Sequence, residues 1–272
     1  MEKVIFNNVI NIVLIVAGLI FTVSPTDVRQ TKNPEQLIAE MEKAVGNWDD
    51  LYALKDVQFD YKYLYPQQGI QDLSVEKYVF EGEKSWAKYT IHQINVAPNS
   101  TGEVIQYCEG NSAKVSQAGK QLTDEAAVGL AMFLRKANYF WFVMNFKLRD
   151  PGTIHEYLGE ESVDGVNYDK ISVGYESAVT GKPQNDAYII YINQKTKLID
   201  RFFFSLPAMG VNKPVILMEV DYTESQGILL PTTRRAYMPD PKTGKLSESP
   251  SLVQTSTNLK FNNGFTDEDL SI

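Results

Sequence analysis

Two histidines and one serine–lysine pair are the residues of this chain whose types could support catalysis. His92 and His155 are far apart in the sequence, and neither lies in a His-x-x-x-His or Glu-x-x-His pattern that would bind a metal ion. Ser85 and Lys88 match the Ser-x-x-Lys spacing of penicillin-recognising enzymes, in which both side chains share a helix face. Here the pair lies in an alternating, strand-like segment, where positions i and i+3 point to opposite faces. We therefore expect no catalytic serine and no histidine-bound metal.

Two further groups are weak candidates for a site. Asp267, Glu268 and Asp269 form an acidic cluster near the C-terminus, but the cluster lacks the spacing and the glycine of an EF-hand. Cys108 is the one cysteine, so the chain forms no intramolecular disulfide. Its place in an alternating run is typical of a small buried hydrophobic residue rather than a catalytic thiol. The sequence thus predicts a protein that is not an enzyme and that needs no cofactor.

Composition narrows the class of partner. The net charge is −8 and no basic run is present, which argues against a nucleic-acid surface. Hydrophobic residues make up 43% of the 272 residues, enough for a packed core. A chain of this length forms one large β domain or two small ones, and no low-complexity tract or repeat divides it. We expect a single domain over residues 34–272.

The N-terminus resembles an export signal. Residues 9–23 are apolar except for Asn11 and Thr22, and Lys3 precedes them. This run has the length of a signal-peptide core and is shorter than the roughly 20 residues of a membrane-spanning helix. Cleavage near Ser24 is one outcome, but Pro25 weakens that site, so an uncleaved N-terminal anchor is the alternative. Either predicts an exported protein, periplasmic or membrane-associated, with residues 1–24 as signal or anchor and 25–33 as linker.

The remaining chain reads as α+β and mostly β. Asn33, Pro34 and Gly46 predict the start and end of a helix, and a second helix is expected from residue 126 to 136. Residues 139–146 continue that helix or break into a loop. The cleanest strand covers residues 57–65, where alternation places four aromatic side chains on one face. Further strands are expected at residues 74–81, 85–93, 102–108, 113–117, 154–158, 163–166, 168–175, 187–192, 198–204, 215–222, 229–237 and 252–261.

The order of these elements resembles the LolA/LolB-type lipoprotein-carrier superfamily, particularly its uncharacterised exported members common in Bacteroidota. The local features that carry the resemblance are the segment Glu-Glu-Ser-Val-Asp-Gly-Val-Asn-Tyr at residues 160–168, the hairpin at 196–201, and Leu230-Pro231-Thr232. The resemblance implies a half-open β-barrel, a curved antiparallel sheet with an N-terminal helix and a central helical insert. It also implies an apolar cavity for acyl chains. No functional residue of the carriers maps onto this chain, so the resemblance carries the architecture and not the site.

The aromatic run at residues 139–146 is the main candidate for a binding site. Its sequence, Tyr-Phe-Trp-Phe-Val-Met-Asn-Phe, is compatible with a buried core segment. It is also compatible with a flexible lining or lid over an acyl-chain cavity, because the preceding helix is also apolar and the tyrosine face of residues 57–65 could form the opposite wall. The candidate ligand-binding residues are Phe59, Tyr61, Tyr63, Leu130, Phe133, Leu134, Tyr139, Phe140, Trp141, Phe142 and Met144.

Three functions are compatible with these patterns. The leading hypothesis is an exported binding protein that holds a lipid or lipoprotein acyl chain, with possible membrane association through its N-terminus. The second is a structural or protein-interaction module of the cell envelope, with a filled core and a protein partner. The third, a hydrolase or sugar-processing enzyme, requires convergent carboxylates that the sequence alone does not pair. An open cavity favours the first and a filled one the second.

Overall fold

The computed structural model describes residues 31–95, 97–98 and 100–272. Within this part of the chain, residues Lys32–Ile272 form one compact unit. The expected signal or anchor at residues 1–24 and residues 25–30 of the expected linker lie outside the described residues. Among the helices described, none is both long and apolar enough to cross a membrane.

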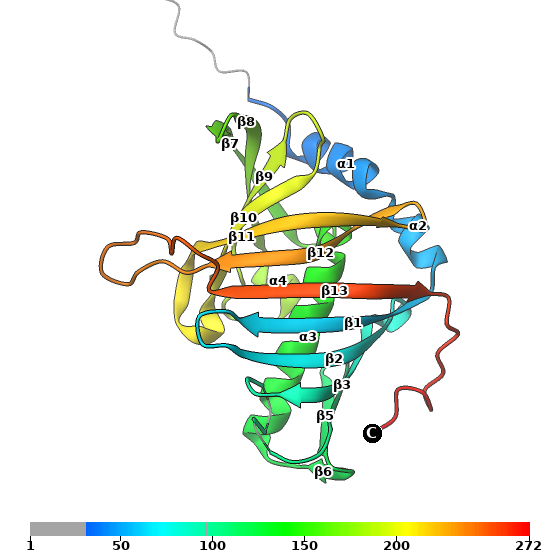
Figure 1. The fold of residues 1–272 in the computed structure, drawn as a ribbon. Coiled ribbons are helices and arrows are strands. Elements are labelled where there is room, and N and C mark those ends of the chain that lie inside the picture. Colours follow the sequence, from blue (N-terminus) through cyan, green and yellow to red (C-terminus); the bar gives the residue numbers. More distant parts are fainter. Residues whose placement is uncertain (1–30, 96, 99) are drawn as a thin grey trace, which may run out of the picture. The chain divides into compact units, whose positions relative to one another are not determined.

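The unit is built on a single antiparallel sheet whose strand order is β6-β5-β4-β3-β2-β1-β13-β12-β11-β10-β9-β8-β7. Its first half is β1 (Asp56–Tyr65), β2 (Ile70–Val79), β3 (Lys84–His92), β4 (Val104–Glu109), β5 (Ser112–Gln117) and β6 (Lys120–Leu122). Its second half is β7 (Thr153–Val163), β8 (Val166–Tyr175), β9 (Tyr188–Asn193), β10 (Ile199–Leu206), β11 (Val211–Ser225), β12 (Ile228–Tyr237) and β13 (Leu252–Phe261). The sheet curves strongly (Figure 1), so the expected mostly-β, curved antiparallel architecture is confirmed.

The long helix α3 (Glu125–Lys147) connects the two halves and lies along the concave face of the sheet (Figure 1). The first half runs outward from β1 to β6, and α3 then carries the chain back across the sheet. The second half returns strand by strand until β13 pairs with β1. Residues 139–146 therefore continue the helix and form no loop, which decides between the two sequence-based alternatives.

The helix α1 (Pro34–Val45) begins and ends where its sequence signals predicted. The Asn33 side chain accepts a hydrogen bond from the Glu35 amide at 3.0 Å, and Gly46 ends the helix with a positive φ of 108°. One face of α1 is buried in the main core. The short helices are α2 (Trp48–Ala53), α4 (Ser177–Thr180) and the 3-10 helices η1 (Glu81–Glu83) and η2 (Pro207–Met209).

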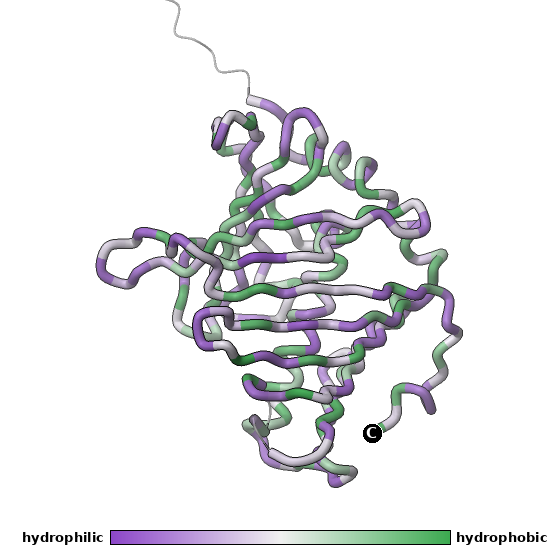
Figure 2. Tube along the Cα trace, in the orientation of Figure 1, coloured by the Kyte–Doolittle hydropathy of each residue, from purple (hydrophilic) through white to green (hydrophobic). Residues whose placement is uncertain are grey.

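Alternation along the strands assigns their faces, and Figure 2 shows it as alternating apolar and polar positions. In β1, Phe59 and Tyr61 are buried against α3, whereas Asp60 and Lys62 are exposed on the outer face. One expected strand is wrong: residues 163–166 form the turn between β7 and β8. Asp164 and Gly165 have φ values of 52° and 80°, the left-handed conformation that an Asp-Gly hairpin turn requires. Strand β6 was not predicted.

The C-terminal segment after β13 folds back onto β1–β3 and is held by a buried carboxylate. Asp56 accepts hydrogen bonds from the backbone amides of Asn263 at 2.7 Å and Gly264 at 2.8 Å. The acidic cluster that follows forms a capped turn, because Asp269 Oδ2 accepts from the Thr266 amide at 2.9 Å. No group of three or more potential metal ligands occurs within the described ranges.

Candidate functional site

The predicted aromatic residues come together where α3 crosses the concave face. At about 100° per residue, the helix presents two apolar faces. The first carries Ala131, Arg135, Tyr139, Phe142, Val143 and Phe146, all of them buried. The second carries Leu130, Phe133, Leu134, Ala137, Phe140, Trp141 and Met144. We call the first the packed face and the second the open stripe.

The packed face meets the inner side of β1 and β2. The Phe142 ring stacks on Phe59 with centroids 4.9 Å apart and planes 8° from parallel. Tyr139 meets Tyr78 at 5.3 Å, and Tyr61 packs edge-on against Phe59 at 6.2 Å. Each of these five rings is at most 4% exposed. Of the predicted residues, Phe59, Tyr61, Tyr139 and Phe142 thus belong to one closed ring cluster.

The open stripe turns toward β9 and β10. Phe140 lies 5.8 Å from Tyr188, and Trp141 lies 4.8 Å from Phe204, measured between ring centroids. Phe140 and Trp141 are nevertheless only half-buried. Along the stripe Met144 is 4% exposed and Leu134 is 8% exposed, whereas Leu130 at the N-terminal end is 39% exposed. The stripe is therefore an apolar surface that is deep at one end and reaches solvent at the other.

The remaining predicted residues lie in the N-terminal half of the open stripe and near the end of β1. Phe133 is half-buried and Leu134 is 8% exposed, both in the N-terminal half of α3. Tyr63 is half-buried near the end of β1 and packs edge-on against Tyr65 at 5.6 Å. Burial raises the Tyr63 pKa well above its usual value.

A buried ionic network, which the sequence analysis missed, fixes the packed face of α3 to the sheet. The Arg135 and Glu76 side chains are both completely buried and form an ion pair. The Arg135 guanidinium also donates to Tyr89 Oη at 2.6 Å and to Gln106 Oε1 at 3.1 Å. One signal was visible in the sequence: Glu76 occupies an inward position between Ser74 and Tyr78, and Arg135, with the neighbouring Lys136, interrupts an otherwise apolar helix segment.

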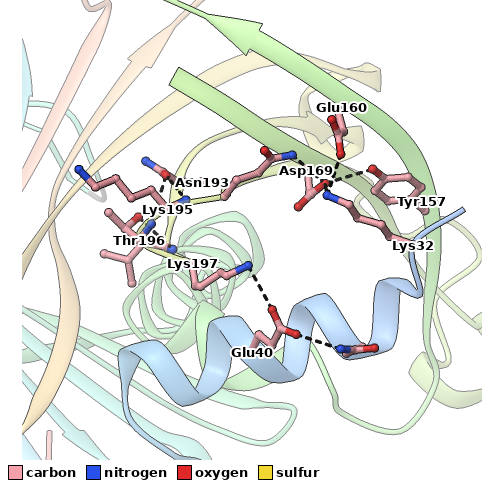
Figure 3. Close-up of polar contacts among 12 residues, drawn as sticks. Lys32, Glu40, Tyr157, Glu160, Asp169, Asn193, Lys195, Thr196 and Lys197 are labelled. Atoms are coloured by element: carbon pink, nitrogen blue, oxygen red, sulfur yellow. Dashed lines mark hydrogen bonds and ion pairs between the residues drawn. The ribbon is translucent and has the colours of Figure 1, made fainter. Parts of the chain in front are cut away.

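A second polar cluster anchors α1 at the far end of the concave face (Figure 3). Lys32 Nζ lies 2.7 Å from both Asp169 Oδ1 and Glu160 Oε1, and Tyr157 Oη donates to Asp169 at 3.1 Å. Desolvation lowers the pKa of Lys32, but the hydrogen bonds to Asp169 and Glu160 outweigh it and raise that pKa overall. The N-terminal end of α1 is thus held against β7 and β8.

The histidines and the cysteine occupy structural positions. His92 Nδ1 and Nε2 lie 2.9 and 2.8 Å from the carbonyl oxygens of Ala97 and Gly102, bracing the loop after β3. His155 Nδ1 lies 2.6 Å from Glu35 Oε1. Cys108 is buried, and desolvation raises its pKa, which disfavours the reactive thiolate.

Two open hollows of about 300 and 400 Å³ lie along β1. Their lining includes the outward-facing residues Asp60, Lys62 and Thr257. Neither is lined by a residue of α3. The central part of the concave face is instead filled by the stacked rings of the packed face.

The chain matches the model of a family of unknown function, DUF6503, over residues 87–246, which is more than half of its length. The chain belongs to this family. The match runs from β3 to the loop after β12 and contains the whole of α3. The comparison with curated proteins finds no relative.

Several solved protein structures have a fold similar to that of this chain. A DUF1329 family protein from Desulfovibrio piger is similar with a TM-score of 0.52 at 12% identity, covering 88% of this chain and 98% of that one. A putative outer membrane lipoprotein-sorting protein domain from Vibrio parahaemolyticus has a TM-score of 0.50 at 10% identity, covering 88% and 97%. A LolA superfamily protein from Nitrosomonas europaea has a TM-score of 0.49 at 14% identity, covering 89% and 99%. At these low identities, the first two similarities concern the fold and not the function. The expected LolA-like fold is confirmed.

Proposed function

We propose that this protein is an exported, non-enzymatic binding protein that holds the acyl chain of a lipid or lipoprotein. The acyl chain would lie along the half-buried side of the open stripe, beside the contacts of α3 with β9 and β10. The observation that supports the proposal most directly is the half-burial of Phe140 and Trp141, which face a wall of Tyr188, Phe202 and Phe204. The rings of the closed cluster offer no apolar surface to an acyl chain, whereas these do.

The two ends of the stripe differ in exposure. Leu130 is 39% exposed and Met144 is 4% exposed, so an acyl chain would extend between a solvent-exposed end at Leu130 and a buried end near Met144. Apolar area removed from water contributes roughly 25 cal/mol per Å² before ordering costs. The similarity of fold to a lipoprotein-sorting domain agrees with such a role but does not extend to the ligand.

Tryptophan fluorescence tests the proposal. Changing Trp48 and Trp86 to phenylalanine leaves Trp141 as the one tryptophan. Titration of this variant with oleate or with phosphatidylglycerol vesicles is expected to shift the Trp141 emission, because the ligand displaces water from a half-buried ring. Native mass spectrometry of the periplasmically expressed protein should show a co-purified lipid. An unchanged emission together with a lipid-free mass contradicts the proposal.

Two matched aspartate variants separate the stripe from the packed face. Phe140→Asp places a charge on a half-buried ring position and should weaken lipid binding while the sheet stays folded. Phe142→Asp buries a charge without a partner inside the ring cluster and should unfold the domain. A thermal melt beside each lipid titration distinguishes the two effects. If Phe140→Asp binds lipid as the parent does, the stripe is not the binding surface.

The alternative is a protein-interaction module of the cell envelope with a filled core. The position of the two hollows along β1, with no contribution from α3, favours it. Under this alternative, Lys62→Glu on the outer face would weaken the binding of an envelope protein, and Phe140→Asp would not. Lipid binding that depends on Phe140 excludes it as the main function.

A further inference from the structure

A buried arginine on the concave face lacks an acidic partner. Arg234 of β12 is only 2% exposed, and no ion pair within the described part of the chain includes it. Its Nε donates to Gln254 Oε1 at 2.8 Å, and its Nη1 donates to the Pro231 carbonyl at 3.4 Å. Neither acceptor carries a charge, so the guanidinium is buried without neutralisation. Burial of an unpaired charge is costly, and such groups normally have a counter-charge.

The other buried charges near the core are each accounted for. Glu76 pairs with Arg135, and Asp169 pairs with Lys32. Asp56 accepts from the C-terminal segment, and Asp72 accepts from the amides of the loop after β3. None of these carboxylates is available to Arg234. No buried carboxylate among the described residues therefore neutralises the Arg234 guanidinium.

Two buried hydroxyl groups lie near Arg234. Tyr61 Oη and Ser256 Oγ donate no hydrogen bond among the described residues. Tyr61 and Ser256 lie directly opposite each other on β1 and β13, and Ser256 is two residues from Gln254, the partner of Arg234. Desolvation raises the pKa of Tyr61 to about 12, although the charge of Arg234 and a hydrogen bond from its side chain lower it. The guanidinium and the two hydroxyl groups thus lie near one place on the concave face.

This place lies at the deep end of the open stripe. Asn145, which follows Met144 on α3, donates to Tyr222 Oη of β11 at 3.1 Å. Arg234 is the register partner of Val220 on β11, and Val220 is two residues from that same Tyr222. Arg234 therefore lies close to the point where the stripe ends.

We infer that Arg234, Tyr61 and Ser256 form an anion subsite that binds the carboxylate of a fatty acid whose chain lies along the open stripe toward Leu130. The inference rests on the proposed function, since it names the ligand class of the same groove. A guanidinium can donate two parallel hydrogen bonds to a carboxylate, and the hydroxyl groups can donate one each. A phosphate ion shares this chemistry, so the test separates a free anion from a lipid carboxylate.

The binding test compares oleate with oleyl alcohol, which has the same chain and no charge. The full chain should bind oleate at least about tenfold more tightly, because a hydrogen-bonded ionic contact is made only with the carboxylate. Arg234→Met should remove this preference and leave the affinity for oleyl alcohol unchanged. Tyr61→Phe, which keeps the ring, should reduce the oleate affinity by a smaller factor. Arg235→Met is the matched control, because Arg235 lies on the outer face and pairs with Asp221.

The melting temperature in inorganic phosphate, compared with chloride at equal ionic strength, provides a readout that is independent of lipid. Phosphate should raise it in the parent protein and not in Arg234→Met. Equal binding of oleate and oleyl alcohol overturns the anion subsite while the proposed function stands. A phosphate effect without lipid binding supports a free-anion subsite and overturns the proposed function. Absence of both effects, or an oleate preference that survives Arg234→Met, overturns the subsite.

Discussion

The rings of Phe59 on β1 and Phe142 on α3 lie face to face, with centroids 4.9 Å apart and planes 8° from parallel. Both side chains are at most 2% exposed. The contact joins the first half of the sheet to the helix that leads into the second half. It therefore determines how closely α3 can approach β1, and it leaves the open stripe as the part of the helix able to change its contacts.

Phe142→Ala should lower the free energy of unfolding by about 3–5 kcal/mol, because it leaves a cavity in a closed ring cluster. Leu130→Ala, on the exposed end of the same helix, should cost less than about 1 kcal/mol. Urea denaturation of both variants measures the difference. Equal costs would show that the two faces of α3 are packed alike, and the distinction between them would then be wrong.

The ion pair between Glu76 and Arg135 should behave as a buried pair. Arg135→Met leaves the Glu76 carboxylate buried and unpaired, so it should lower the free energy of unfolding by about 3–5 kcal/mol. The double variant Glu76→Leu/Arg135→Met should recover much of this loss, since no charge then remains buried. The pair of Lys88 and Glu103, with both side chains about 40% exposed, is the control and should be worth at most about 1 kcal/mol. A double variant no more stable than Arg135→Met would contradict this account.

Local signals in the sequence predicted most elements correctly. Alternation in β1 and the Asn33 and Gly46 signals around α1 depend on neighbouring residues, and these elements were found close to their expected bounds. The interior of the β7–β8 hairpin was misread because Val163 and Val166 flank an Asp-Gly turn and look like a strand by composition.

The pairing of strands that are far apart in the chain could not be predicted from the sequence. The antiparallel pairing of β1 with β13 joins segments near opposite ends of the chain, and no local pattern specifies it. The division of α3 into a packed face and an open stripe likewise depends on which strands surround it. Arg135 and Arg234 look alike in the sequence, yet the fold gives a carboxylate partner only to Arg135. The candidate site could therefore be predicted by residue type but not by role.

Lys32→Met should destabilise the unit, because Asp169 is 1% exposed and Lys32 is its ion-pair partner. The Asp169 carboxylate would keep hydrogen bonds from Tyr157 and Gln194, so the expected cost is about 1–3 kcal/mol. Lys195→Met, at an exposed position of the β9–β10 turn shown in Figure 3, is the control and should have little effect. Thermal melts compare the two. An unchanged melt for Lys32→Met would show that the anchor of α1 lies elsewhere.

Export should be visible at the N-terminus of the mature protein. The apolar run at residues 9–23 behind Lys3 predicts a signal peptide, and cleavage should give a first residue between positions 24 and 32. N-terminal sequencing of protein from the periplasmic and membrane fractions measures this. An intact Met1 in the membrane fraction would indicate the uncleaved anchor, and an intact Met1 in the cytoplasm would contradict export.

Buried tyrosines should make the protein sensitive to alkaline pH. Burial raises the pKa of Tyr61 to about 12, and it raises those of Tyr78, Tyr139 and Tyr188 above their usual values. In the unfolded chain a tyrosine ionises near pH 10, so between about pH 10 and 12 the unfolded state loses protons that the folded state keeps. The stabilising contribution of these groups is fully present below about pH 10 and is lost as the pH rises toward 12. Denaturation midpoints across this range, with tyrosinate absorbance as the probe, should fall steadily. Tyr61→Phe should lessen the pH dependence of stability by the equivalent of at most one titrating proton. A midpoint that stays constant would show that these phenols titrate freely in the folded protein.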